Sequence, residues 1–310
     1  MKHNRVSLVT LTALVSAFAL SACGDSSAPS SGTLSLRLTD APFPYDSVAR
    51  ADMFVVRIDG KMADADSEDA SGAEATSNED PSKGWVTLAA PNQSFNLLDL
   101  QNGTTTSLGQ ATLPTGSYRG FRLILDTDRS SVTLKDGTVL SGSATPGIKW
   151  PSAGKTGVKI NLDQPINLVA QGADMVIDFD LGRSFVLRGN SIGDQGLLFK
   201  PVVRGVARDI TGSVSGSVRA DSATGAAVPL ATVEALKAGT SLADTSAANV
   251  LRTAQADSTG AFHLMYLLPG TYEVRATPPS GVPYAPALLS SVTVASGTDA
   301  AGSVVVLPHQ

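Results

Sequence analysis

The feature that most constrains this chain is the alternation of apolar and polar side chains with a period of two. In the segment GTLSLRLTDAP, Leu34, Leu36 and Leu38 alternate with polar residues. Successive side chains of a strand point to opposite faces of a sheet, so this period is typical of a half-buried β-strand. The same pattern returns in three later segments: DMFVVRIDG, GFRLILD and DMVIDFDLG. Because no long stretch of the sequence shows helical spacing, we predict an all-β fold.

The strands fall into two series, which predicts two domains. A chain of 310 residues has room for about two domains of roughly 100 to 200 residues each. The first series includes a hairpin at VTLKDGTVL, whose Asp136-Gly137 pair favours a type I′ turn. From Ile210 onwards the chain is richer in Gly, Ala and Ser, and a second series of strands begins. We therefore predict two β-sandwich domains in tandem, over residues 32–208 and 209–310.

Residues 1–22 have the pattern of a secretory signal peptide. A basic head from Lys2 to Arg5 precedes a mostly apolar stretch from Val6 to Leu20, and small residues follow. Cys23 comes next, and as the only cysteine of the chain it cannot form an internal disulfide. The Ser, Pro and Gly residues that follow predict a flexible tether over residues 23–31. An ordinary buried thiol fits poorly, because such a tether offers no core.

The tetrad Leu20-Ser21-Ala22-Cys23 resembles the lipobox of bacterial lipoproteins. The resemblance implies cleavage before Cys23 and attachment of acyl chains such as palmitate to this residue, which anchors the protein in a membrane. It also implies that Gly24, where some lipoproteins carry an aspartate, favours the outer membrane. We therefore predict a lipoprotein of the bacterial cell envelope. The sequence does not decide whether it faces the periplasm or the cell surface.

Two further resemblances cover most of the remaining chain. The first lies over residues 32–208 and is similar to a bacterial lipoprotein family known as domain of unknown function 4382, which implies no activity. It rests on five segments in order: GTLSLRLTDAP, FNLLDLQNG, LPTGSYRGFRLIL, MVIDFDLGRSFV and LLFKPVVRGVAR. The second lies over residues 210–310, where DSTGAFHLMYLLPGTYEVRA resembles the carboxypeptidase regulatory-like domain. That resemblance implies a non-catalytic, prealbumin-like β-sandwich with the shape of carbohydrate-binding folds.

The chain departs from these families in two connections. KAGTSLADTSAANVLRT is longer than the usual connection of the second family, and the acidic loop from Met62 to Lys83 is longer than expected for the first. An acidic loop can bind calcium, but the fixed D-x-[DN]-x-[DN]-G spacing is absent. We therefore favour a solvated loop over residues 62–83 and leave cation binding open.

Composition and histidine content argue against several functions. The formal net charge of −5 makes nucleic acid an unexpected partner. The histidines are His3, His263 and His309, so the first mature domain has none. A Ser-His-Asp or Cys-His site is hard to build there, because it needs a base within hydrogen-bond reach of the nucleophile. We predict no cofactor and no metal site.

Two groups of residues remain as candidates for chemistry. Asp174, Asp178 and Asp180 share one face of DMVIDFDLG, and neighbours two residues apart lie about 6.5 to 7 Å from each other, within the range of glycosidase carboxylate pairs. We nevertheless favour a solvated face or partners for arginines. Trp150, in the polar segment GIKWPSAGKTG, is a candidate ligand contact, although packing is the more common role of tryptophan.

We weigh three hypotheses for function. The first is a non-catalytic, membrane-anchored envelope lipoprotein that acts as a binding or adhesion module for a glycan or an envelope protein. The second is a structural spacer in the assembly of envelope proteins, since strand edges can recruit further strands. The third is a hydrolase that uses Asp178 and Asp180. We favour the first, because the sequence combines an anchor with no evident catalytic grouping.

Overall fold

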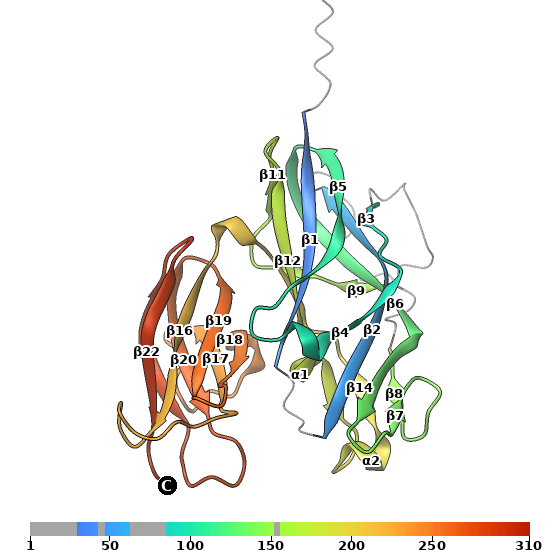
Figure 1. Ribbon diagram of the computed structural model, residues 1–310. Coiled ribbons are helices and arrows are strands. Elements are labelled where there is room, and N and C mark those ends of the chain that lie inside the picture. The colour runs from blue at the N-terminus through green and yellow to red at the C-terminus, as the bar shows by residue number, and fades with distance from the viewer. Residues whose placement is uncertain (1–29, 43–46, 63–84, 152–155) are drawn as a thin grey trace, which may run out of the picture.

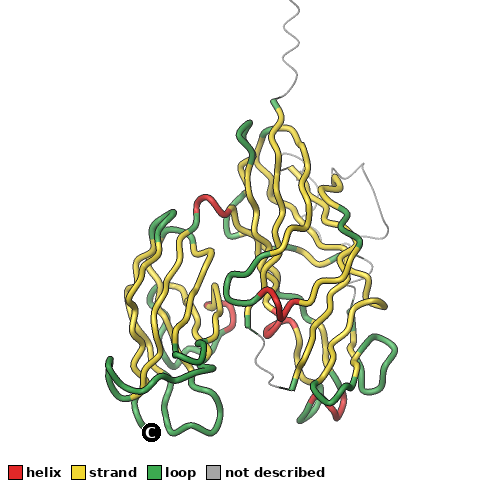
Figure 2. The backbone as a smooth tube through the Cα atoms, in the orientation of Figure 1, coloured by secondary structure: helices red, strands yellow, loops and turns green. Residues whose placement is uncertain are grey.

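The structure is a computed structural model that describes residues 30–42, 47–62, 85–151 and 156–310. Cys23 and all but the first residue of the acidic loop lie outside the described residues. Strands make up most of the described chain, and its helices are no longer than four residues (Figure 2). None of the described helices has the length and apolar character needed to span a bilayer. The all-β prediction is confirmed.

A first set of strands, which we call the N-terminal unit, packs two main sheets around one core. One sheet has the order β10 (Asn161–Leu162), β15 (Val203–Ala207), β12 (Ala173–Asp180), β1 (Ser31–Ala41) and β5 (Thr106–Pro114). The other has the order β11 (Ile166–Leu168), β6 (Gly116–Leu134), β2 (Val48–Met62) and β3 (Trp85–Ala89). Three short strands pair at its margins: β4 (Gln93–Asn96), β7 (Val139–Leu140) and β9 (Val158–Lys159).

The alternation in β1 explains its central place. Leu34, Leu36 and Leu38 are buried in the core between the sheets, and β1 pairs in parallel with β12 and antiparallel with β5. A third, small sheet extends the N-terminal unit at the end that lies far from the start of β1 (Figure 1). It contains β13 (Phe185–Leu187), β14 (Leu197–Phe199) and β8 (Ile148–Lys149).

The remaining strands form a second core, and we call them the C-terminal unit. One sheet has the order β19 (Ala261–Leu267), β16 (Gly212–Ala220) and β22 (Asp299–Leu307). The other has the order β18 (Val250–Gln255), β17 (Thr232–Lys237), β20 (Gly270–Thr277) and β21 (Ala287–Val294). The chain passes between the units through the short helix η4 (Arg208–Ile210). The two cores are separate clusters, while the predicted domain limits stay a prediction.

The turn predicted at Asp136-Gly137 joins β6 to β7, but its type differs from the prediction. Thr133 pairs with Val139, so the hairpin is present. Only Gly137 has a positive φ, of 90°, whereas a type I′ turn needs positive φ at both central residues. The carboxylate of Asp136 accepts a hydrogen bond of 2.8 Å from the amide of Thr138, which stabilises the longer loop instead.

Candidate functional site

The predicted site residues that the structure describes fall in two places, and Cys23 lies outside the described residues. Trp150 follows β8, in the small third sheet. Asp174, Asp178 and Asp180 lie on β12, next to the C-terminal unit. These two places are described in turn below.

Trp150 is half-buried and packs on an aromatic cluster. Its ring lies 4.7 Å from that of Phe199 and 5.8 Å from that of Phe185, measured between centroids, the latter edge to face. The cluster forms because β8 pairs in parallel with β14, which carries Phe199. Packing therefore accounts for one face of the ring.

The other side of Trp150 borders an open depression on the surface. Its lining residues include polar and charged side chains of three kinds, from Asp128, Ser143 and Lys149, together with Gly142, Ile148 and Pro151. The indole Nε1 is buried and finds no hydrogen-bond partner among the described residues. An aromatic ring beside convergent polar groups is typical of binding sites for polar ligands, and ligand contact by Trp150 stays a prediction.

At Asp178 and Asp180 the acidic face of β12 is not solvated, contrary to one of the two alternatives that we favoured. Asp178 and Asp180 are each only 8% exposed. The cause is the C-terminal unit, which covers this face. Val176, which lies between Asp174 and Asp178 along the strand, packs in a small cluster with Val206 and with Tyr266 of the C-terminal unit. The other alternative, pairing with arginines, describes what the structure contains.

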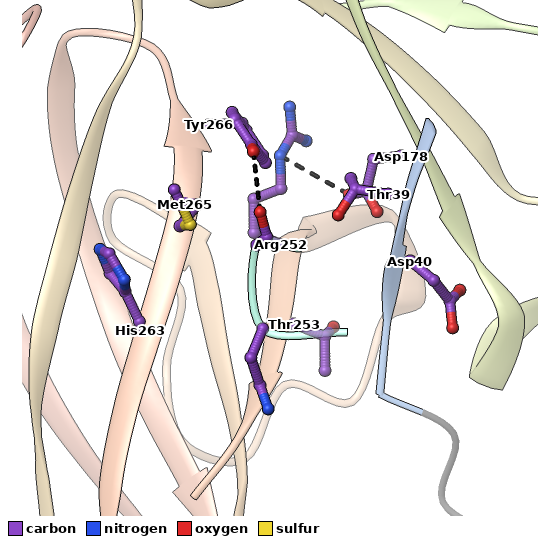
Figure 3. Close-up of a pocket in the computed structure, with 10 residues that line it drawn as sticks. Thr39, Asp40, Asp178, Arg252, Thr253, His263, Met265 and Tyr266 are labelled. Atoms are coloured by element: carbon purple, nitrogen blue, oxygen red, sulfur yellow. Dashed lines mark hydrogen bonds and ion pairs between the residues drawn. The ribbon is translucent and has the colours of Figure 1, made fainter. Parts of the chain in front are cut away.

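Three arginines surround these acids. Arg252, from β18 of the C-terminal unit, places its Nε 3.7 Å from Oδ2 of Asp178 and its Nη2 2.9 Å from Oδ2 of Asp163. Asp163 also accepts from Nη1 of Arg204, at 3.2 Å. Figure 3 shows the Arg252 side chain reaching from one unit to Asp178 on the other.

Asp180 begins the short helix α1 (Leu181–Ser184). Its Oδ1 accepts a hydrogen bond of 2.9 Å from the amide of Arg183, and its Oδ2 lies 3.5 Å from Nη1 of the same arginine. Burial, with a smaller contribution from the charge of Asp178, raises the pKa of Asp180 to about 6. Burial likewise raises the pKa of Asp178, against the opposing effect of the Arg252 and Arg204 charges.

A fourth acid of the group, Asp40, escaped the sequence reasoning. It is 3% exposed, its Oδ1 accepts from the amide of Leu181 at 2.9 Å, and its Oδ2 has no hydrogen-bond partner among the described residues. Burial raises its pKa well above the ordinary value, and the charges of Asp178 and Asp180 add to this. The signal was present, because Asp40 stands two residues after Leu38 on the apolar side of the alternation.

The space beside the acids is small. The pocket at the junction has room for little more than a water molecule. Thr39 and Asp178 border it from the N-terminal unit, and Met265 and Tyr266 border it from the other (Figure 3). A glycosidase needs space for a sugar between its two carboxylates, so we favour a structural role for Asp178 and Asp180.

His263 lies on β19 and is among the residues that line the junction pocket from the C-terminal unit (Figure 3). It pairs across the strands with Ser215, and its Nε2 is 3.8 Å from Oδ1 of Asp299. The hydroxyls of Ser213 and Ser215 both donate to Asp299. The serines therefore lack the pairing with a histidine base that a nucleophile requires, and the imidazole side chain is 40% exposed.

The described residues contain no group of three or more His, Cys, Asp or Glu that could hold a metal ion. The acidic loop, for which cation binding was left open, lies outside this search apart from Met62. The buried Asp40, Asp178 and Asp180 and the part-buried Asp163 have arginines and backbone amides as the partners that the structure describes.

Comparison with solved structures gives only remote likenesses. A type II cohesin–X-dockerin complex from Acetivibrio cellulolyticus shares 22% identity over 31% of this chain and 56% of that chain, with a TM-score of 0.21. The TIE protein of Bacillus anthracis shares 12% over 90% of this chain and 34% of that chain, with a TM-score of 0.23. The shaft pilin SpaA of Lactobacillus rhamnosus GG shares 11% over 91% and 98%, with a TM-score of 0.25. This chain thus spans about half of the first structure and a third of the second, and likenesses this low carry no argument about it.

A family model gives a firmer result. No curated protein matches the chain. The family model described as "Domain of unknown function (DUF4382)" matches residues 31–201, which is more than half of the 310 residues. The match begins with β1 and includes β12 and Trp150, and it confirms the first of the two resemblances over nearly the predicted range. The chain belongs to the domain of unknown function 4382 family.

Proposed function

We propose that this protein is a lipid-anchored lipoprotein of the bacterial cell envelope, in the outer membrane, that acts as a non-catalytic binding or adhesion module. The observation that carries the proposal is that the start of β1 and the depression beside Trp150 lie at opposite ends of the N-terminal unit. Cys23 precedes Ser31, the first residue of β1, by eight positions. A tether of this length keeps the start of β1 close to the membrane.

The strand that follows the tether runs through the core of the N-terminal unit, and the depression lies at the opposite end of that unit. β1 lies between β12 and β5 in its sheet, so in the proposed scheme the tether leads into a central strand of the core. In Figure 1, β1 starts at the top, whereas β7, β8 and α2 (Ile192–Gln195) lie at the bottom. Since Trp150 directly follows β8, the depression points away from the membrane, where a partner can reach it.

A glycan is the ligand class that we favour. A half-buried indole offers an apolar face for a sugar ring, and the carboxylate, hydroxyl and ammonium groups of Asp128, Ser143 and Lys149 offer hydrogen bonds to its hydroxyls. The resemblance of residues 210–310 to the carboxypeptidase regulatory-like domain, with its carbohydrate-binding-like shape, points in the same direction. An envelope protein is the alternative ligand for the same depression.

An assembly spacer remains the second candidate function, and one observation favours it. Among the described strands, β5 pairs with β1 alone, so its other edge has backbone groups that can pair with a strand of another protein. In that case the partner would bind along Thr106–Pro114 rather than at the depression.

Replacing Cys23 with serine is expected to release the protein from membranes. The hydroxyl of serine does not accept the acyl chains of the lipoprotein pathway, and without them nothing else in the proposed scheme holds the chain to a bilayer. Fractionation and labelling with radioactive palmitate check this, with Ser26→Ala in the tether as the control that stays in the membrane fraction. Incorporation of label into the Cys23→Ser protein contradicts the anchor.

Binding at the distal depression is tested with a glycan array. We expect Lys149→Ala and Asp128→Ala to lower the affinity for any bound glycan roughly tenfold each, by loss of hydrogen bonds to charged groups, without a change in thermal stability. Trp150→Phe should keep the packing on Phe199 and lower the affinity as well. Lys159→Ala, on β9, is the matched control. Unchanged binding in all three depression variants contradicts this location, and capture of an envelope protein through β5 favours the spacer.

A further inference from the structure

The connection between β17 and β18 is the segment that the sequence analysis found to be longer than the usual connection of the carboxypeptidase regulatory-like domain. It runs from Lys237, the end of β17, to Val250, the start of β18, and includes the short helix η5 (Ala247–Asn249). The structure places this connection and the start of β18 against the N-terminal unit. We call residues 238–253 the docking segment.

Two arginines of the N-terminal unit donate hydrogen bonds to backbone carbonyls of the docking segment. Arg183, in α1, donates from Nη2 to the carbonyl of Ala247 at 2.5 Å and from Nη1 to that of Val250 at 3.4 Å. Arg204, in β15, donates from Nη2 to the carbonyl of Val250 at 3.1 Å. Asp180 and Asp163 hold these guanidinium groups, so the donors are preorganised for the contact.

One arginine of the docking segment makes the reverse contact. Arg252 reaches into the N-terminal unit to Asp163 and Asp178, and its side chain is only 4% exposed. Three arginines thus face three aspartates in this group, and each charge has a partner of opposite sign. Separating the units would break the pairs of Arg252 with Asp163 and Asp178. Removing one partner of a buried pair leaves a buried charge without compensation.

Apolar contacts lie beside the charged group. Val176 and Val206 of the N-terminal unit pack with Tyr266 of the other unit, and Met265 and Leu268 lie against them. The hydroxyl of Tyr266 donates to the carbonyl of Gly103 at 3.2 Å. The two units are joined covalently only by the four residues between β15 and β16, so these contacts decide whether they move independently.

We infer that the docking segment locks the two units into one rigid body that unfolds in a single cooperative step. Domains joined by a short linker move relative to each other unless their interface is large or specific. Here the interface is specific, because arginines cross it in both directions. Arg252 reaches two acids of the N-terminal unit, and Arg183 and Arg204 reach backbone carbonyls of the docking segment. The inference does not rest on the anchor or on ligand binding, since it concerns only contacts within the chain.

Calorimetry of the full chain carrying Cys23→Ser tests the lock. We expect one unfolding transition in the otherwise unchanged chain and two separate transitions after Arg252→Ala, because the units then unfold independently. Arg219→Ala is the matched control: Arg219 lies on β16 of the same unit, its Nε donates to Ser217 within the strand, and the single transition should persist. Two independent transitions in the unchanged chain, or a single one in Arg252→Ala, would overturn the inference.

A distance measurement keeps the test informative if Arg252→Ala does not fold. Spin labels at Thr138→Cys and Ser280→Cys, in exposed turns of the two units, should give one narrow distance distribution in the Cys23→Ser background. Arg183→Gln, which removes the guanidinium that donates to the carbonyls of Ala247 and Val250, should broaden it. A broad distribution before this substitution, or an equally narrow one after it, contradicts the lock.

Discussion

From about pH 4 to pH 7 the free energy of unfolding of this protein is expected to fall as pH rises, and Asp180→Asn is expected to remove about 3 kcal/mol of that fall. The folded state raises the pKa of Asp180 from 3.8 to about 6. It therefore binds the proton more tightly than the unfolded chain does. The stabilisation is fully present below about 3.8 and is lost as pH rises through about 6.

Two other buried acids act in the same direction. Burial raises the pKa of Asp40 and of Asp178, so each also favours folding at the lower pH. The acids with lowered pKa act oppositely, since they favour folding above their ordinary pKa and lose this as pH falls. They are four residues in exposed turns or on the outer sheet face: Asp126, Asp136, Asp257 and Asp299. Their effect belongs below about pH 4.

Urea unfolding at a series of pH values measures the slope. Asparagine at position 180 keeps the oxygen that accepts from the Arg183 amide and cannot ionise. The variant should therefore keep its fold and lose this part of the pH dependence of stability. Asp174→Asn is the control, because Asp174 lies on the same strand but is part-exposed and paired with Arg37 and Arg208. An unchanged slope in Asp180→Asn shows that this carboxylate does not titrate as the burial implies.

The fold class could be predicted because one local signal governs it. Alternation in β1 and β12 follows from side chains that point to opposite faces of a strand, and the core between the sheets requires that period. The pairing of β1 with β12 in parallel could not be predicted, because strands far apart in sequence meet through the packing of the whole unit. The type of the turn at Asp136 was also missed, since the Asp-Gly pair suits several loop lengths.

The acidic group shows where reasoning from a single strand stops. The alternation correctly placed Asp178 and Asp180 on the face opposite Phe179, but it could not show that a second unit covers this face. The covering residue Arg252 belongs to a connection that the sequence marked only as longer than usual. Asp40 could have been found, because an acid on the apolar side of β1 must be buried with a partner or hold its proton.

Phe199→Ala is expected to lower the free energy of unfolding by about 3 to 5 kcal/mol, the usual loss for truncating a large buried aromatic residue. Phe199 is 1% exposed, and its ring is the centre of the cluster. The centroid distances are 4.7 Å to Trp150, 5.2 Å to Phe185 and 6.1 Å to Phe179. Removing it leaves a cavity that three other rings border, and rings held by strands cannot collapse into it.

The same substitution should change the position of Trp150 beside the depression, because the ring of Trp150 packs on that of Phe199. In a Trp85→Phe background, the fluorescence of Trp150 reports its own surroundings, since the chain has two tryptophans. We expect Phe199→Ala to shift this emission to longer wavelength as water reaches the ring. Phe199→Leu, which keeps most of the buried volume, should lose less stability and shift the emission less. A loss below about 1 kcal/mol in Phe199→Ala, well under the usual range, would mean that the cluster does not hold Trp150 in place. The depression would then need another support.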